Sequence, residues 1–157
     1  LIFGRYPYHQ GRPSENDKAI VENALASFQL QAFAERYLTE LSGGQRQRAM
    51  IAMVFCQQTD YVLLDEPLNN LDMYYARNLM QLLRRLTDEH SRTTVVVLHD
   101  INQAAAYADH VVAMKGGRVA MTGHPNEVFT AANIRELFDM DVDVLDYKGR
   151  KLVVHHV

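Results

Sequence analysis

Tyr61-Val62-Leu63-Leu64-Asp65-Glu66-Pro67 is the stretch that decides the fold: a continuous apolar run that ends in two acids and a proline. Thr94-Val95-Val96-Val97-Leu98 is a second run of the same kind, and it ends at His99-Asp100. Strands that are apolar throughout, rather than alternating, are typical of a parallel sheet that is covered on both faces. Because residues 73–89 between the two runs repeat leucines at helical spacing, the three segments predict a strand–helix–strand unit.

Further elements are predicted on both sides of this unit. Residues 15–28 have the spacing of an amphipathic helix that starts after Ser14, and a second helical stretch is expected near 31–38. An unbroken helical run follows Gln45 to about Gln57. After an alanine-rich helix, four short strands are predicted, at residues 110–114, 118–122, 142–147 and 150–155. The sequence therefore predicts an α/β fold.

The ends of the two apolar strands carry candidate site residues. In open α/β sheets, ligands bind beyond the carboxyl ends of the strands, where Asp65, Glu66 and His99 are expected. An aspartate at a strand end suits Mg²⁺, which keeps phosphate oxygens among its other ligands. A neighbouring glutamate could orient or deprotonate an attacking water. Taken alone, however, the two acids are explained at least as well as solvated residues that cap a strand.

Leu41-Ser42-Gly43-Gly44-Gln45 adds a candidate anion site. Each glycine at a helix start costs about 1 kcal/mol relative to alanine, which is reasonable where a ligand must approach the backbone closely. Ser42 is expected to cap the helix and to leave the N–H groups of Gly43 and Gly44 at its positive end. The combination of this segment with the apolar run and acids at 61–67, an element that begins sixteen residues after Gln45, favours a phosphate site over a plain capped helix.

These motifs resemble, in order and spacing, those of the ATPase subunits of ABC transporters. The similarity covers the signature motif at 41–45, Walker B with its glutamate at 61–67, the D-loop at 69–72 and the switch histidine at His99. Leu68-Asn69-Asn70 departs from the Thr-Ser-Ala of many relatives but leaves Asp72 in place. Gly4-Arg5-Tyr6-Pro7 and residues 98–105 further resemble importers of ferric siderophores, and heme and cobalamin importers share much of this wording, so the chelate is left open.

The resemblance implies a P-loop NTPase-like ABC ATPase core with a mostly parallel sheet, over 58–157, and a helical subdomain over 1–57. It implies a head-to-tail homodimer in which each ATP lies between the P-loop of one subunit and the signature segment of the other. Asp65 would help to hold Mg²⁺, Glu66 would act as general base, and His99 would contact the γ-phosphate. Residues that would meet the partner's nucleotide or cross the dimer interface are Ser42, Gly43, Gly44, Gln45 and Asp72. Other implied partners are a membrane permease and, indirectly, a periplasmic binding protein, at the cytoplasmic face of the bacterial inner membrane.

The P-loop pattern Gly-x-x-x-x-Gly-Lys-Ser/Thr occurs nowhere in the 157 residues, which begin at Leu1 without a methionine. The chain is therefore expected to be the rear portion of such a subunit, inactive in ATP hydrolysis by itself. In the family the P-loop strand lies between the strand that ends at His99 and the one at 110–114. Without it, we expect these two strands to pair directly or to recruit a strand from another copy.

Composition narrows the alternatives. A net charge of −3 does not suggest a nucleic-acid binder, and the single cysteine, Cys56, excludes an internal disulfide and is expected to be an inert buried thiol. Adjacent His155 and His156 are poorly arranged to bind one metal ion. Two other functions stay open: a soluble ABC-type ATPase acting on nucleic acid or ribosomes, and a catalytically silent interaction module.

Overall fold

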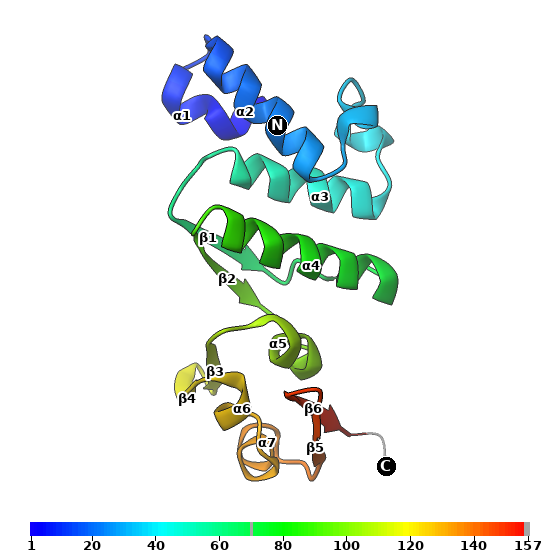
Figure 1. The fold of residues 1–157 in the computed structure, drawn as a ribbon, viewed down its shortest axis with the longest axis vertical. Coiled ribbons are helices and arrows are strands. Elements are labelled where there is room, and N and C mark those ends of the chain that lie inside the picture. The colour runs from blue at the N-terminus through cyan, green and yellow to red at the C-terminus, as the bar shows by residue number, and fades with distance from the viewer. Residues whose placement is uncertain (70, 156–157) are drawn as a thin grey trace. The chain divides into compact units, whose positions relative to one another are not determined.

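The computed structural model describes residues 1–69 and 71–155, which form two compact units, Leu1–Val97 and Leu98–Val157 (Figure 1). Each unit is built around its own helices and strand pairs. Asn70 and His156, which the sequence analysis names, lie outside the described residues. The predicted division near residue 57 is at a different place from the boundary between the units, and it stays a prediction.

In the first unit, α3 lies between α2 and strand β1. Its elements are η1 (Ile2–Arg5), α1 (Tyr6–His9), α2 (Glu15–Ser27), η2 (Gln31–Phe33), η3 (Leu38–Glu40), α3 (Gly43–Phe55), β1 (Tyr61–Asp65), α4 (Met73–Glu89) and β2 (Thr93–Val97). Helix α3 contacts α2 on one side and β1 on the other, and α4 packs on β2 (Figure 1). The helices expected at 15–28 and after Gln45 are confirmed, whereas the expected helix near 31–38 is replaced by the short 3-10 turns η2 and η3.

The two apolar runs pair in parallel, as predicted. Strand β1 lies beside β2 in a register that sets Tyr61 opposite Thr93 and Asp65 opposite Val97. Val62 and Leu64 are buried, and α4 supplies a buried stripe of residues spaced three or four apart, Ala76, Leu79, Met80, Leu83 and Leu86. The strand–helix–strand unit therefore fixes Asp65 at a carboxyl end of the sheet.

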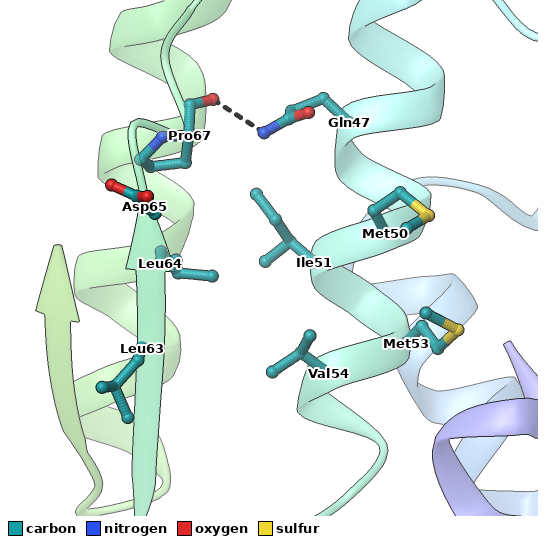
Figure 2. Close-up of a pocket in the computed structure, with 9 residues that line it drawn as sticks. All are labelled: Gln47, Met50, Ile51, Met53, Val54, Leu63, Leu64, Asp65 and Pro67. Atoms are coloured by element: carbon teal, nitrogen blue, oxygen red, sulfur yellow. Dashed lines mark hydrogen bonds between the residues drawn. The ribbon is translucent and has the colours of Figure 1, made fainter. Parts of the chain in front are cut away.

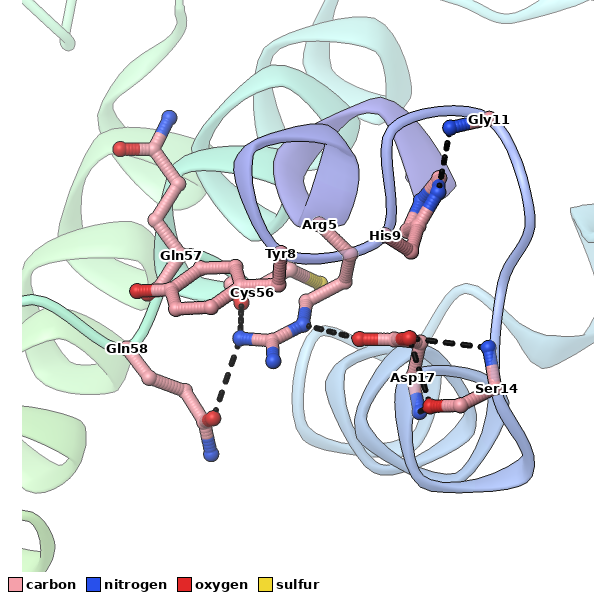
Figure 3. A network of polar contacts seen from close by, with 9 residues as sticks. All are labelled: Arg5, Tyr8, His9, Gly11, Ser14, Asp17, Cys56, Gln57 and Gln58. Carbon is pink, nitrogen blue, oxygen red and sulfur yellow. Dashed lines mark hydrogen bonds and ion pairs between the residues drawn. The ribbon is translucent and has the colours of Figure 1, made fainter.

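A buried ion pair ties the start of the chain to α2, and a hydrogen bond of the same arginine ties it to the end of α3. Arg5 and Asp17 are 4% and 3% exposed, and Arg5 Nε donates to the Asp17 carboxylate at 2.9 Å (Figure 3). Arg5 Nη1 also donates to the Cys56 carbonyl at 2.9 Å. The hydroxyl and backbone N–H of Ser14, followed by Arg5, lower the pKa of Asp17 to about 2. Because Ser14 and Asp17 also form the capping box of α2, the same contacts start that helix.

The second unit surrounds a small apolar core. It contains α5 (Ile101–Tyr107), β3 (Val111–Lys115), β4 (Arg118–Gly123), α6 (Pro125–Val128), α7 (Ala131–Phe138), β5 (Asp143–Tyr147) and β6 (Arg150–Val154). Its buried core residues are Ala105, Val128, Phe129 and Ile134. Strands β3 and β4 form the predicted antiparallel hairpin around Gly116-Gly117, and β5 and β6 form a second one.

The two strands that flank the expected gap belong to different units. Among the described residues, β2 pairs with β1 in the first unit and β3 pairs with β4 in the second. Direct pairing of β2 with β3 and recruitment of a strand from another copy both stay predictions. Among the helices that the structure describes, none has the length and apolarity needed to cross a membrane.

Candidate functional site

The start of α3 presents a capped helix end to solvent. Ser42 is the N-cap: its hydroxyl accepts from the N–H of Gln45 at 3.4 Å, and its own N–H donates to Gln45 Oε1 at 3.0 Å. Ser42 and Gly43 are exposed, and a Cβ placed on Gly43 would have no atom within 4 Å. Within the described part of the chain, the N–H groups of Gly43 and Gly44 have no hydrogen-bond acceptor. The helix end therefore leaves two N–H groups available, with open space in front of Gly43, and anion binding there stays a prediction.

The start of α4 lies against this helix end. Asp72 is the N-cap of α4, and its carboxylate accepts from the N–H of Tyr75 at 3.0 Å. A Cβ on Gly44 would meet Leu71 at 3.7 Å and the Tyr75 ring at 3.8 Å, which are ordinary contact distances. The structure thus brings the 42–45 segment next to the residues that flank Asp72, and Asp72 itself remains exposed.

The acids at the end of β1 have different backbone conformations. Asp65 is the last strand residue and is exposed, whereas Glu66 is half-buried and has a φ of 47°, in the left-handed region that a glutamate rarely adopts. Such a conformation costs on the order of 1–3 kcal/mol and persists where surrounding contacts hold it. The N–H of Asn69 donates to the Glu66 carbonyl at 3.2 Å, and the Asn69 amide donates to the Glu66 carboxylate. These bonds close a turn in which Glu66 lies outside β1, which ends at Asp65.

Gln47 connects the two motifs, and the sequence analysis assigned it no role. Its Nε2 donates to the Pro67 carbonyl at 3.1 Å, directly after Glu66 (Figure 2). Below this bond, α3 and β1 line an open cavity of about 180 Å³ with the apolar side chains of Met50, Ile51, Met53, Val54, Leu63 and Leu64. A lone amide at the end of an apolar helix face was the available signal.

His99 belongs to the second unit, whereas Asp65 and Glu66 belong to the first. It is exposed and directly precedes Asp100, the N-cap of α5. The Asp100 carboxylate accepts from the N–H groups of Asn102 and Gln103 at 2.8 and 3.2 Å. The turn that carries His99 is therefore fixed locally by this cap.

A carboxylate such as Asp65 fits Mg²⁺ through its chemistry alone. Mg²⁺ in phosphate sites needs only one or two carboxylates, because waters and phosphate oxygens complete its shell. Across residues 1–69 and 71–155, no three His, Cys, Asp or Glu side chains gather as a metal-binding group. Cys56 is buried, and burial raises the pKa of its thiol, as expected of an inert cysteine.

Comparison with known proteins shows which proteins the chain resembles. The family model described as "ABC transporter" matches residues 4–69. The petrobactin import ATP-binding protein YclP of Bacillus subtilis (strain 168) is 45% identical over 155 residues, which are 99% of this chain and 62% of that protein. The chain is similar to an ABC transporter ATP-binding protein over nearly its whole length.

Other relatives and solved structures agree with this similarity. The iron(3+)-hydroxamate import ATP-binding protein FhuC of Bacillus subtilis (strain 168) is 39% identical over 92% of this chain and 55% of its own length. A structure described as a metal-chelate type ABC transporter, in an inward-facing conformation, superposes with a TM-score of 0.87 at 28% identity. It covers 98% of this chain and 64% of the other. The predicted ABC ATPase fold is thereby confirmed, and the chain spans between about half and two thirds of the length of these proteins.

Proposed function

We propose that the chain is part of the ATP-hydrolysing subunit of a bacterial importer for ferric siderophores or related metal chelates. The observation that carries this proposal is the meeting, in one unit, of an open Ser42-capped helix end, the exposed Asp72 and the turn that holds Glu66. The relatives, which are import ATP-binding proteins for petrobactin and ferric hydroxamate, support the class of cargo.

The helix end serves ATP that is held by a second subunit. Ser42, Gly43, Gly44 and Gln45 approach its γ-phosphate, since backbone N–H groups at a helix start attract anions and nothing fills the space before Gly43. The homodimer is head-to-tail, and Asp72 extends from the start of α4 across the interface.

The strand end serves the subunit's own ATP. Bound Mg²⁺ neutralises charge on the phosphates, and Asp65 is the carboxylate that would help to hold it. Glu66 takes a proton from the attacking water, and its left-handed conformation sets it apart from the strand for this task. His99 contacts the γ-phosphate from the turn before α5.

The remaining partners follow from the same assignment. Closing and opening of the dimer drives a conformational change in a membrane permease. A periplasmic binding protein delivers the chelate to the permease without contacting this chain. The subunit works at the cytoplasmic face of the inner membrane. Residues 1–157 by themselves do not hydrolyse ATP, because they contain no phosphate-binding loop.

A chimera tests the proposal. The part of the YclP relative that precedes its matched region is joined to residue 1 of this chain, and ATP turnover is measured with Mg²⁺. We expect turnover by the chimera and none by residues 1–157 alone. Glu66→Gln lowers turnover by about 10²–10⁴-fold, while ATP still drives dimer formation.

The matched control is Glu22→Gln, which removes an exposed carboxylate from α2 and leaves turnover unchanged. A folded chimera that binds ATP but never hydrolyses it would favour the silent interaction module instead. Equal turnover in the Glu66→Gln and Glu22→Gln variants would refute the assignment of the base.

A further inference from the structure

Asn102 fastens the C-terminal hairpin to the helix that follows His99. It is the second residue of α5, and its backbone N–H donates to the Asp100 carboxylate at 2.8 Å. The capped turn before it contains His99, three residues upstream. Asn102 therefore takes part, through its backbone, in the turn that presents the histidine.

The side chain of Asn102 bonds twice to one distant backbone residue. Its Nδ2 donates to the Val153 carbonyl at 3.0 Å, and its Oδ1 accepts from the Val153 N–H at 2.8 Å. The two residues are 51 positions apart. The amide thus acts as an additional strand residue beside β6, and α5 packs against that strand.

The register of the hairpin explains why Val153 is available. Strand β6 pairs with β5 on its other edge, where Val153 lies opposite Val144. In antiparallel strands, opposite residues alternate between pairs that exchange hydrogen bonds and pairs that do not. Since both backbone groups of Val153 bond to Asn102, this pair is of the second kind, and the amide satisfies an otherwise open edge.

Only an asparagine side chain suits this position. An amide offers one donor face and one acceptor face, whereas a carboxylate only accepts and a hydroxyl is shorter. Glutamine is longer by one methylene and would push the hairpin away from α5. Val153 is 3% exposed, so its backbone groups lose solvent as an alternative partner.

We propose that Asn102 is a positioning residue for His99, and that it couples the C-terminal hairpin to the histidine turn. The inference rests on the proposed function, in which His99 contacts the γ-phosphate. The side-chain amide holds the start of α5 against β6, and the backbone N–H of the same residue bonds to the Asp100 carboxylate. Loss of the amide leaves the cap itself in place but lets the start of α5, with the turn attached to it, shift relative to β6. The hairpin is then part of the support of the ATP site.

The first test uses the chain of 157 residues and needs no ATP. Asn102→Ala is compared with Asn126→Ala, which removes a 3.3 Å hydrogen bond from an exposed amide to Gly149 in the same hairpin. Amide hydrogen exchange at Val153 is expected to accelerate about tenfold in Asn102→Ala only. The imidazole resonances of His99 shift or broaden in the same variant and stay unchanged in Asn126→Ala. Unchanged His99 resonances beside accelerated exchange at Val153 would overturn the coupling.

The second test measures ATP turnover in the chimera. We expect Asn102→Ala to lower kcat by about ten- to a hundredfold and to change KM for ATP by less than about twofold. The reason is that the substitution displaces His99 but leaves the binding of ATP intact. A fall in KM and kcat together with unmoved His99 resonances would contradict a positioning role. If the unsubstituted chimera is inactive, the proposed function fails, and the His99 resonances alone decide the coupling.

An isosteric variant guards against a folding defect. Asn102→Asp keeps the shape and the acceptor oxygen but loses the donor to the Val153 carbonyl. If Asn102→Ala unfolds the second unit, Asn102→Asp is judged by the same two readouts. Wild-type exchange at Val153 and wild-type His99 resonances in Asn102→Asp would then refute the proposal.

Discussion

Substitution of Gly4 by alanine should destabilise the first unit strongly, because a Cβ at Gly4 would lie 2.1 Å from the Met53 carbonyl oxygen. The Met53 oxygen belongs to the backbone and the position of a Cβ is fixed by its own backbone, so no side-chain rotation relieves the contact, and the segments must separate by about 0.9 Å to reach 3.0 Å. Overpacking of this kind costs about 1–3 kcal/mol. The movement also strains the buried bond from Arg5 to the Cys56 carbonyl, and hydrogen bonds of charged groups contribute about 1.5–3 kcal/mol.

We therefore expect a loss of about 2.5–6 kcal/mol, with about 3 kcal/mol as the working value, in the free energy of unfolding. With a urea slope of about 1.5 kcal/mol/M, the unfolding midpoint falls by about 2 M, measured by circular dichroism at 222 nm. The matched control is Gly43→Ala, where an added Cβ meets no atom within 4 Å and alanine favours the helix. Its midpoint should stay or rise. A Gly4→Ala midpoint within about 0.3 M of the parent would refute the close packing described here.

Two further predictions concern single carboxylates. The pKa of Asp17 is lowered to about 2 in the folded chain, so its contribution to stability is complete above its ordinary pKa of 3.8 and is lost as the pH falls toward 2; urea midpoints measured across this window should fall less steeply in Asp17→Asn than in the parent. Asp72→Ala should lower the free energy of unfolding by about 1 kcal/mol, because the N-cap of α4 is lost, whereas Asp72→Asn keeps the cap. Reduced ATP turnover of the Asp72→Asn chimera at unchanged stability would assign Asp72 to the dimer interface. Unchanged turnover in Asp72→Asn would leave Asp72 only its capping role.

Local patterns were sufficient for the elements that hold the site. The apolar run at 61–65 and its partner at 93–97 predicted a parallel pair, which is confirmed, whereas the expected cover on both faces is wrong for β1, because Val62 and Leu64 are buried and Leu63 is exposed. The Ser42 cap was predicted from the chemistry of a helix start and is confirmed by its two bonds with Gln45. Both features depend on residues within one element or its immediate neighbour.

Contacts between distant segments were not predictable in the same way. The left-handed φ of Glu66 is one example, because nothing in a glutamate favours it and the bonds from Asn69 and neighbouring contacts maintain it. The pairing of Asn102 with Val153 is another, since it depends on the register of a hairpin 51 residues away. Arg5 belongs to the Gly4–Pro7 segment that resembles siderophore importers, but its burial against Asp17 is seen only in the structure. Tertiary packing decides such features, and local propensity does not.

The hydrogen bond from Gln47 to the Pro67 carbonyl has a consequence for communication between the two ATP sites of the proposed dimer. Residues 42–45 at the start of α3 would respond to the nucleotide of one site, while Glu66, adjacent to Pro67, would act on the nucleotide of the other. A single hydrogen bond of 3.1 Å from the Gln47 side chain thus connects the helix that carries residues 42–45 to the turn that carries Glu66. If nucleotide binding at one site moves α3, this hydrogen bond moves the turn around Glu66 with it. Occupancy of one site then changes activity at the other, which is measured as cooperativity. Loss of the Gln47 side chain would therefore change the Hill coefficient for ATP as well as the rate of turnover.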